Sequence, residues 1–316
     1  MSAEERVAQA PFDNARADLI LRSKDEEPML FRVYKSILSM ASPVFADMFS
    51  LPSNEGSDEI QVVDLPENSE ILDLALRHIF PVPSPKVSQL HQMYSLAEFA
   101  RKYRVDALEQ DVKRYLTDAI GHDPVGVFAI AVTYGYKAIG ERATKSSLNI
   151  EFSRLESRFV KYVPAGLYWD LLKYHVECGK AASAVASERS WFSSLGLSGK
   201  FISRNGCTSC NSQDFIGVTR KQRCVLSSES SGLRLNSADS GFPNQRYGPR
   251  CLWNYLHRSA MFLAHCPNAD AVTTDDFVLE IFDCPSCPVH TRHDLLGFSK
   301  MFGIQIKEAI AKVWIP

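Results

Sequence analysis

The stretch FRVYKSILSMASPVFADMF, residues 31–49, constrains the fold more than any other part of the sequence. Its first residues continue an apolar run, PMLFRV, that is typical of a buried strand. Residues 35–41 then place apolar side chains on one helical face. Ser42 is a preferred N-cap residue, and Pro43 suits the first turn of a helix, where its missing N–H costs nothing. The stretch therefore predicts a strand, a helix, a capped restart and a second helix.

The flanking segments predict a small α+β domain. The run ADLILRS and the charged turn SKDEE precede PMLFRV, which predicts an antiparallel hairpin. EIQVVDL, residues 59–65, has the apolar content of another strand. Helical spacing follows in residues 67–80, and the three prolines in residues 81–85 must end that helix. Further helices are expected over residues 89–103 and along Leu108, Val112 and Leu116.

Composition limits the classes of protein to consider. The chain has 316 residues, of which 45% are hydrophobic and 23% charged, which indicates a globular protein of about two domains. A net charge of −2 provides no overall field for nucleic acid or an anionic membrane. MSAEERVAQAP lacks the apolar region of a signal peptide, and no apolar run is long enough to span a bilayer. We expect a cytoplasmic or nuclear protein with no membrane partner and with reduced cysteines.

Two spaced motifs stand out in residues 13–118. The first combines Tyr34-Lys35, Ile37-Leu38, Ser42 and Val44-Phe45, and the second combines Tyr94, Leu96-Ala97, Lys102-Tyr103, Val105 and Leu108. In this order they resemble the motifs of the BTB/POZ family. The resemblance implies an α+β fold in which a small, mainly antiparallel sheet is flanked by helices. It also implies a domain that binds other proteins and has no catalytic residues.

The remaining segments are assigned by composition. Residues 1–12 are short and polar and are expected to form a disordered tail. Residues 119–190 read as a helical extension, and residues 191–316 as a cysteine-containing C-terminal domain that ends in an amphipathic helix. Within that domain, residues 227–250 are rich in Ser, Gly and Asn and are expected to be a flexible insert. The C-terminal third also resembles the tails of uncharacterised BTB proteins from mushroom-type fungi.

The spacing of the cysteines is the feature of the sequence that points most clearly to a metal site. Cys207 and Cys210 form one C-x-x-C pair, and Cys284 and Cys287 form a second. Two such pairs can complete a tetrahedral zinc site, which predicts one structural zinc. However, 73 residues separate the two pairs, whereas small zinc ribbons have much shorter spacings. The alternative, that the cysteines bind no metal and occur in pairs by chance, therefore stays open. By contrast, the helical pair His175 and Cys178 could in principle bind a metal but is expected to be core or half-exposed.

A non-enzymatic protein–protein interaction module is the leading functional hypothesis. The BTB/POZ resemblance implies either self-association into a homo-oligomer or binding to a scaffold or adaptor. The expected contact residues follow the second helix of the opening stretch: Met48, Phe49, Leu51 and Pro52. In family adaptors for cullin-type ubiquitin ligases, a hydrophobic-x-Glu step comes next. Here Glu55 and Glu59 follow serines by two residues, so that step is absent.

The alternative hypothesis is a zinc-stabilised nucleic-acid-binding or transcription-associated factor. It would use the basic run TRKQR, residues 219–223, together with the cysteine pairs. The mild overall charge argues against a dedicated nucleic-acid domain. Catalytic signatures such as G-x-S-x-G, H-E-x-x-H and the Walker loop do not occur in the sequence, so we do not expect an enzyme.

Overall fold

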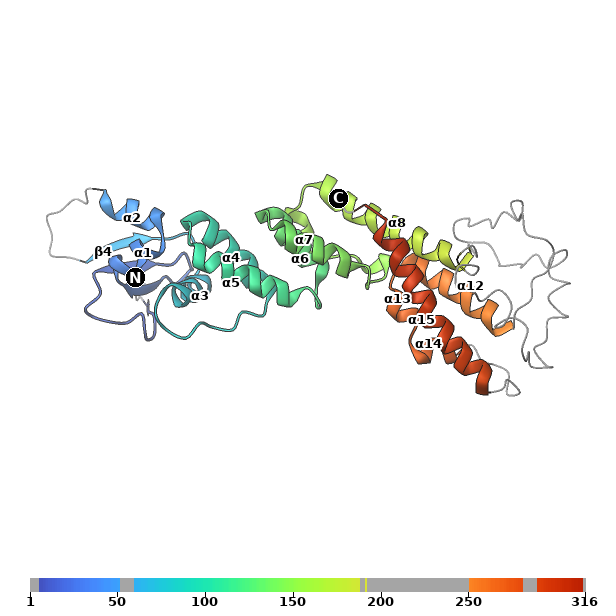
Figure 1. The fold of residues 1–316 in the computed structure, drawn as a ribbon. Coiled ribbons are helices and arrows are strands. Elements are labelled where there is room, and N and C mark those ends of the chain that lie inside the picture. The colour runs from blue at the N-terminus through green and yellow to red at the C-terminus, as the bar shows by residue number, and fades with distance from the viewer. Residues whose placement is uncertain (1–5, 52–59, 188–190, 192–249, 281–288, 315–316) are drawn as a thin grey trace. The chain divides into compact units, whose positions relative to one another are not determined.

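The computed structural model describes residues 6–51, 60–187, 191, 250–280 and 289–314. The chain forms two compact units (Figure 1). Unit 1 comprises Met1–Ser147 and Glu156–Tyr168, and unit 2 comprises Leu148–Leu155 and Trp169–Pro316. The first division falls after Ser147, whereas the sequence suggested boundaries at residues 118 and 190. Helix α6 and its successor α7 therefore belong to the same unit as the sheet.

Unit 1 contains a four-stranded mixed sheet. Its strands are β1 (Arg6–Val7), β2 (Leu19–Arg22), β3 (Met29–Val33) and β4 (Gln61–Asp64), in the order β1-β3-β2-β4. The hairpin β2–β3 is antiparallel, as predicted, while β1 runs parallel to β3 and β4 runs parallel to β2. The expectation of a mainly antiparallel sheet is therefore wrong. Strand β4 follows β3 through two helices, runs in the opposite direction to β3 and lies on the far side of β2, so it pairs with β2 in parallel.

Residues 6–12 are ordered, which corrects the prediction of a disordered tail over residues 1–12. After β1, the Ala8 amide donates a hydrogen bond to the Leu30 carbonyl at 2.8 Å. The Phe12 ring is fully buried and lies 5.9 Å from the Phe31 ring and 5.5 Å from the Phe80 ring, centroid to centroid. One large aromatic side chain thus anchors the segment, although a single apolar residue leaves no periodic signal in the sequence.

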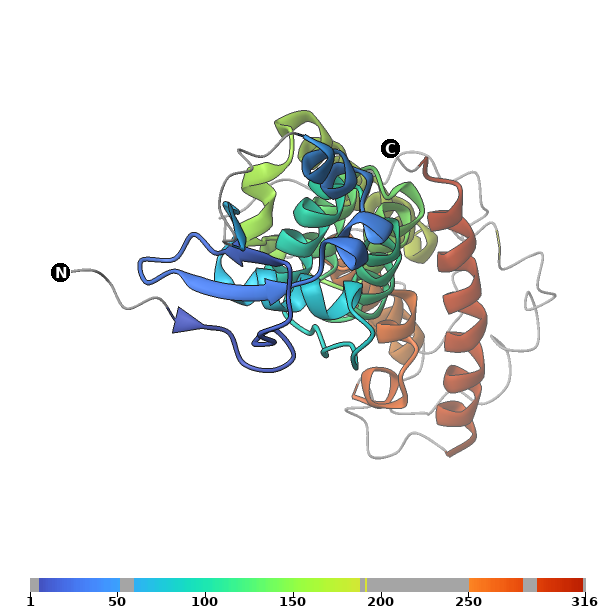
Figure 2. The same ribbon diagram turned by 90° about the vertical axis from the view of Figure 1, so that its left-hand side faces the viewer.

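Helices α1 to α5 flank the sheet (Figures 1 and 2). They are α1 (Lys35–Ala41), α2 (Pro43–Ser50), α3 (Ser69–Ile79), α4 (Leu90–Tyr103) and α5 (Asp106–Ala119). The capped restart predicted at Ser42 is confirmed, since its side chain accepts a hydrogen bond from the Phe45 amide and Pro43 begins α2. Helix α3 ends at Ile79, directly before the proline-rich segment. The fold class expected from the resemblance is confirmed.

The chain continues in unit 1 through α6 (Pro124–Tyr134), α7 (Lys137–Ser147) and the 3-10 helix η2 (Arg158–Tyr162). Helix α6 is buried along most of its length, which explains why its sequence shows no polar face. Asp123 caps its first turn by accepting a hydrogen bond from the Gly126 amide at 2.7 Å. Gly135 ends the helix with a φ of 78°, a conformation that favours glycine.

Unit 2 is helical. Its elements are the 3-10 helix η1 (Phe152–Arg154), most of α8 (Ala165–Ser187), α12 (Arg250–His265), α13 (Ala269–Val272), α14 (Asp275–Leu279) and α15 (Val289–Ala311). The amphipathic stripe predicted for the C-terminal helix is confirmed, because Leu295, Phe298, Phe302 and Ile306 are buried. Helix α8 packs tightly on α12: a Cβ added at Gly179 would lie 2.6 Å from the Ala264 carbonyl oxygen. Of the expected insert 227–250, only Arg250 belongs to the described residues.

Candidate interaction surface

The helix pair α1–α2 carries the contact residues expected from the sequence, and Ser42 fixes this pair to the domain core. Ser42 is fully buried between the two helices. Its hydroxyl oxygen accepts a hydrogen bond from the Phe45 amide at 3.1 Å, and its hydroxyl proton is donated to the Tyr103 carbonyl. One side chain therefore caps α2 and ties the α1–α2 junction to the end of α4.

An aromatic cluster reinforces this attachment. Phe45 of α2 is fully buried and stacks on Tyr103 of α4 with a centroid separation of 4.6 Å and an interplanar angle of 5°. Phe99 lies 4.4 Å from Tyr103, and Phe49 stacks on Phe45 at 5.9 Å. Aromatic pairs at such separations contribute about 0.5–1.5 kcal/mol beyond their buried area. The inner face of α2 is therefore rigidly held.

Charged groups contact the Tyr103 hydroxyl at the edge of the aromatic cluster. The Tyr103 hydroxyl donates a hydrogen bond to a Glu67 carboxylate oxygen at 3.0 Å, and Lys102 Nζ lies 2.8 Å from the other carboxylate oxygen. Burial, followed by the adjacent Glu67 charge, raises the pKa of Tyr103 well above its usual range. The phenol therefore stays protonated and keeps its role as a hydrogen-bond donor.

The outer face of the α1–α2 pair is apolar at two positions. Met40 on α1 is 90% exposed, and Leu51, directly after α2, is 68% exposed. Among the residues predicted as contacts, Leu51 is exposed, Met48 and Phe49 are half-buried, and Pro52 lies outside the described residues. The sequence interpretation missed Met40. Because Leu38 and Ala41 define the inner stripe of α1, a methionine off that stripe was the signal that could have revealed it.

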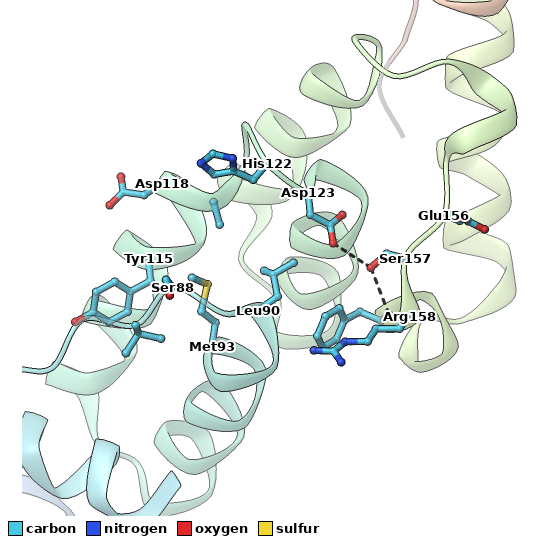
Figure 3. A pocket seen from close by; sticks show the side chains of 13 residues that line it. Ser88, Leu90, Met93, Tyr115, Asp118, His122, Asp123, Glu156, Ser157 and Arg158 are labelled. Atoms are coloured by element: carbon cyan, nitrogen blue, oxygen red, sulfur yellow. Dashed lines mark hydrogen bonds between the residues drawn. The ribbon is translucent and has the colours of Figure 1, made fainter. Parts of the chain in front are cut away.

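A separate cavity of about 960 Å³ lies at the end of α5 within unit 1 (Figure 3). Its apolar lining comes from Val87, Leu90, Met93 and Phe159, and its charged lining from Asp118, Asp123, Glu156 and Arg158. The Ser157 hydroxyl donates a hydrogen bond to Asp123 at 3.2 Å, which links η2 to the cap of α6 (Figure 3). No local sequence pattern indicates this cavity, because its lining joins segments far apart in the chain.

The cysteines of the expected zinc site, Cys207, Cys210, Cys284 and Cys287, all lie outside the described residues. Within the described ranges, no group of three or more His, Cys, Asp or Glu side chains could hold a metal ion. His175 and Cys178 are both buried, which confirms their assignment to the core. Burial raises the pKa of the Cys178 thiol to about 11, so this thiol is unreactive at neutral pH.

The described part of the chain contains no helix that is both long and apolar enough to cross a membrane. A search of curated proteins gave no match to the chain. The family model of the BTB/POZ domain, however, matches residues 10–119. These residues cover strands β2 to β4 and helices α1 to α5, whereas β1 lies just before them, and they include the buried Phe12. Residues 10–119 are therefore a BTB/POZ domain, a domain that generally mediates interactions between proteins.

Proposed function

We propose that this chain is a non-enzymatic interaction protein that self-associates through the outer face of α1 and α2. The exposure of Met40, a residue of α1 that is 90% exposed, carries the proposal. A single exposed apolar side chain is ordinary on protein surfaces. Met40 is distinguished by its place in a BTB/POZ domain, where protein contacts are the general function, and by the exposed Leu51 directly after α2.

The rigidity of the α1–α2 pair supports this assignment. Because Ser42 and the ring of Phe45 fix the inner face of the pair, the outer face presents Met40 and Leu51 without reorganisation of the backbone. A preorganised surface loses less conformational entropy on binding. In a two-fold symmetric dimer, the same patch is buried on both subunits, so Met40 contributes once from each subunit.

A second copy is a better-supported partner than a cullin-type ligase. The hydrophobic-x-Glu step of cullin adaptors is absent between residues 53 and 59, a segment that lies outside the described residues. Self-association needs no such step. If the chain were nevertheless a cullin adaptor, tagged protein isolated from its own cells would retain a cullin, and Leu51→Asp would release it.

The proposal is tested by sedimentation velocity on the full chain across a wide concentration range. Burying one methionine side chain contributes about 1.5–3 kcal/mol, so Met40→Asp should raise the dimer Kd at least about 100-fold when both subunits carry it. Met261→Asp is the matched control, because Met261 is 54% exposed on α12, outside the BTB/POZ domain. A monomeric wild type, or equal weakening by both variants, would overturn the proposal.

A further inference from the structure

Residues Leu148–Leu155, here called the strap, form part of unit 2, although the chain on either side belongs to unit 1. The side chain of Leu148 is buried in a small cluster with Tyr174 and Cys178 of α8. Its carbonyl lies 3.6 Å from the Cys266 sulfur, a weak hydrogen bond. The strap is therefore attached to α8 by one apolar side chain and covers part of the surroundings of two buried thiols.

His175 of α8 makes the third attachment. Its Nε2 lies 3.0 Å from the Ile150 carbonyl oxygen, and its ring lies 5.7 Å from the Phe152 ring, centroid to centroid. Because a carbonyl can only accept a hydrogen bond, Nε2 carries the proton and donates it. Nδ1 is then an unprotonated acceptor. It is buried and has no hydrogen-bond partner among the described residues.

The surroundings of His175 do not favour a positive charge. The ionisable residues on the neighbouring segments include Glu151 and Arg154 on the strap, Asp170, Lys173, Tyr174, Glu177, Cys178 and Lys180 on α8, His265 and Cys266 at the end of α12, Lys307 and Glu308 on α15, and Lys312 after α15. In the described part of the chain, none of them forms an ion pair with the fully buried His175. Burial lowers the pKa of His175 below its ordinary value of 6.5, and the Ile150 carbonyl opposes that shift only in part.

We propose that His175 is an acid-sensitive latch that holds the strap on α8 and releases it when protonated. Protonation would place an N–H at Nδ1, where the closed structure offers no acceptor. Burying an unpaired charged donor is strongly unfavourable. When the strap opens, both ring nitrogens reach water and the charge is solvated. The proton therefore binds preferentially to the open form, and binding of the proton favours opening.

The direction and size of the effect follow from proton linkage. Well above pH 6.5, the ordinary pKa of the side chain, His175 is neutral in both forms and the strap stays closed. As the pH falls below that value, the open form binds one more proton than the closed form. The opening constant then rises about tenfold per pH unit, until the lowered pKa of the closed form is reached.

Hydrogen–deuterium exchange of the full chain between pH 5 and 8, corrected for intrinsic exchange rates, tests the latch. The protection of peptides covering the strap should fall about tenfold per pH unit below about 6.5 in the wild type. His175→Gln should abolish this dependence, because the glutamine amide can still donate to the Ile150 carbonyl but does not titrate in this range. His265→Gln is the matched control: His265 is an exposed histidine of unit 2, and its removal should leave the dependence unchanged.

Equal pH dependence in His175→Gln and the wild type, or a flat wild-type profile, would overturn the latch. If His175→Gln does not fold, exchange of the imidazole C2 hydrogen measures the His175 pKa directly in the wild type. A pKa below 6.5, together with strap opening in the same pH range, supports the proposal. A pKa at or above 6.5 overturns it.

The labelling of Cys266 by a pH-insensitive disulfide reagent should increase in parallel with strap opening, because the Leu148 carbonyl of the strap contacts the Cys266 sulfur in the closed form.

Discussion

Ser42→Ala should destabilise unit 1 substantially, although it removes only one oxygen atom. The buried hydroxyl makes two hydrogen bonds, one from the Phe45 amide and one to the Tyr103 carbonyl. Loss of an N-cap costs about 1 kcal/mol, and a buried carbonyl left without its donor costs about 1–3 kcal/mol. The two effects act on different partners, so together they predict a decrease of about 2–4 kcal/mol in the free energy of unfolding.

The assay must report on unit 1 alone. All four tryptophans, at positions 169, 191, 253 and 314, lie in unit 2, so tryptophan fluorescence would follow the other unit. Hydrogen exchange in increasing urea should instead be followed on peptides from α2 and α4. Ser50→Ala is the control, since the exposed Ser50 hydroxyl bonds only within its own helix, to the Asp47 carbonyl. A loss below about 0.5 kcal/mol for Ser42→Ala, equal to the control, would refute the role given to Ser42.

Three further predictions follow from other parts of the chain. Arg104 adopts a left-handed backbone conformation with a φ of 53°. Arg104→Val should therefore lower the free energy of unfolding of unit 1 by about 1–2 kcal/mol, whereas Arg104→Gly should not lower it. The same exchange experiment measures both variants. The buried Tyr255 hydroxyl donates a hydrogen bond to the Val272 carbonyl at 2.8 Å. Tyr255→Phe should therefore lower the free energy of unfolding of unit 2 by about 1–3 kcal/mol, measured by urea unfolding followed by tryptophan fluorescence. An unchanged urea midpoint would contradict this. If the two C-x-x-C pairs converge, elemental analysis of the full chain will find one zinc ion per chain, and Cys207→Ser and Cys284→Ser will each lose it. A wild-type protein without metal would instead indicate that the cysteines do not form a metal site.

The parts of the fold that could be predicted from the sequence depend on local chemistry. Ser42 and Pro43 mark the restart of a helix by their own hydrogen-bonding preferences, and the proline-rich segment must end α3. Spacing alone also identified the buried stripe of α15. In each case the information lies within a few residues of the element, where capping and periodicity are decided.

The parts that could not be predicted depend on contacts between distant segments. Burial of Phe12 requires Phe31 and Phe80, and no local pattern announces that three-way packing. Likewise, the cavity at the end of α5 arises only when η2 returns to the start of α4, with Tyr162 stacked on Tyr94 at 4.7 Å. Such features are set by tertiary packing rather than by local preference.

Cross-linking mass spectrometry on an equimolar mixture of ¹⁴N- and ¹⁵N-labelled full chain tests the central claim most directly, because links of mixed isotope composition form only between different molecules. Lys35 is a natural reporter, since it lies on α1, the helix that carries Met40. Self-association through the outer face of α1 and α2 predicts mixed-isotope links at Lys35 that disappear in Met40→Asp. Mixed links found only at lysines of unit 2, or none in a chain that sediments as a monomer, would contradict it.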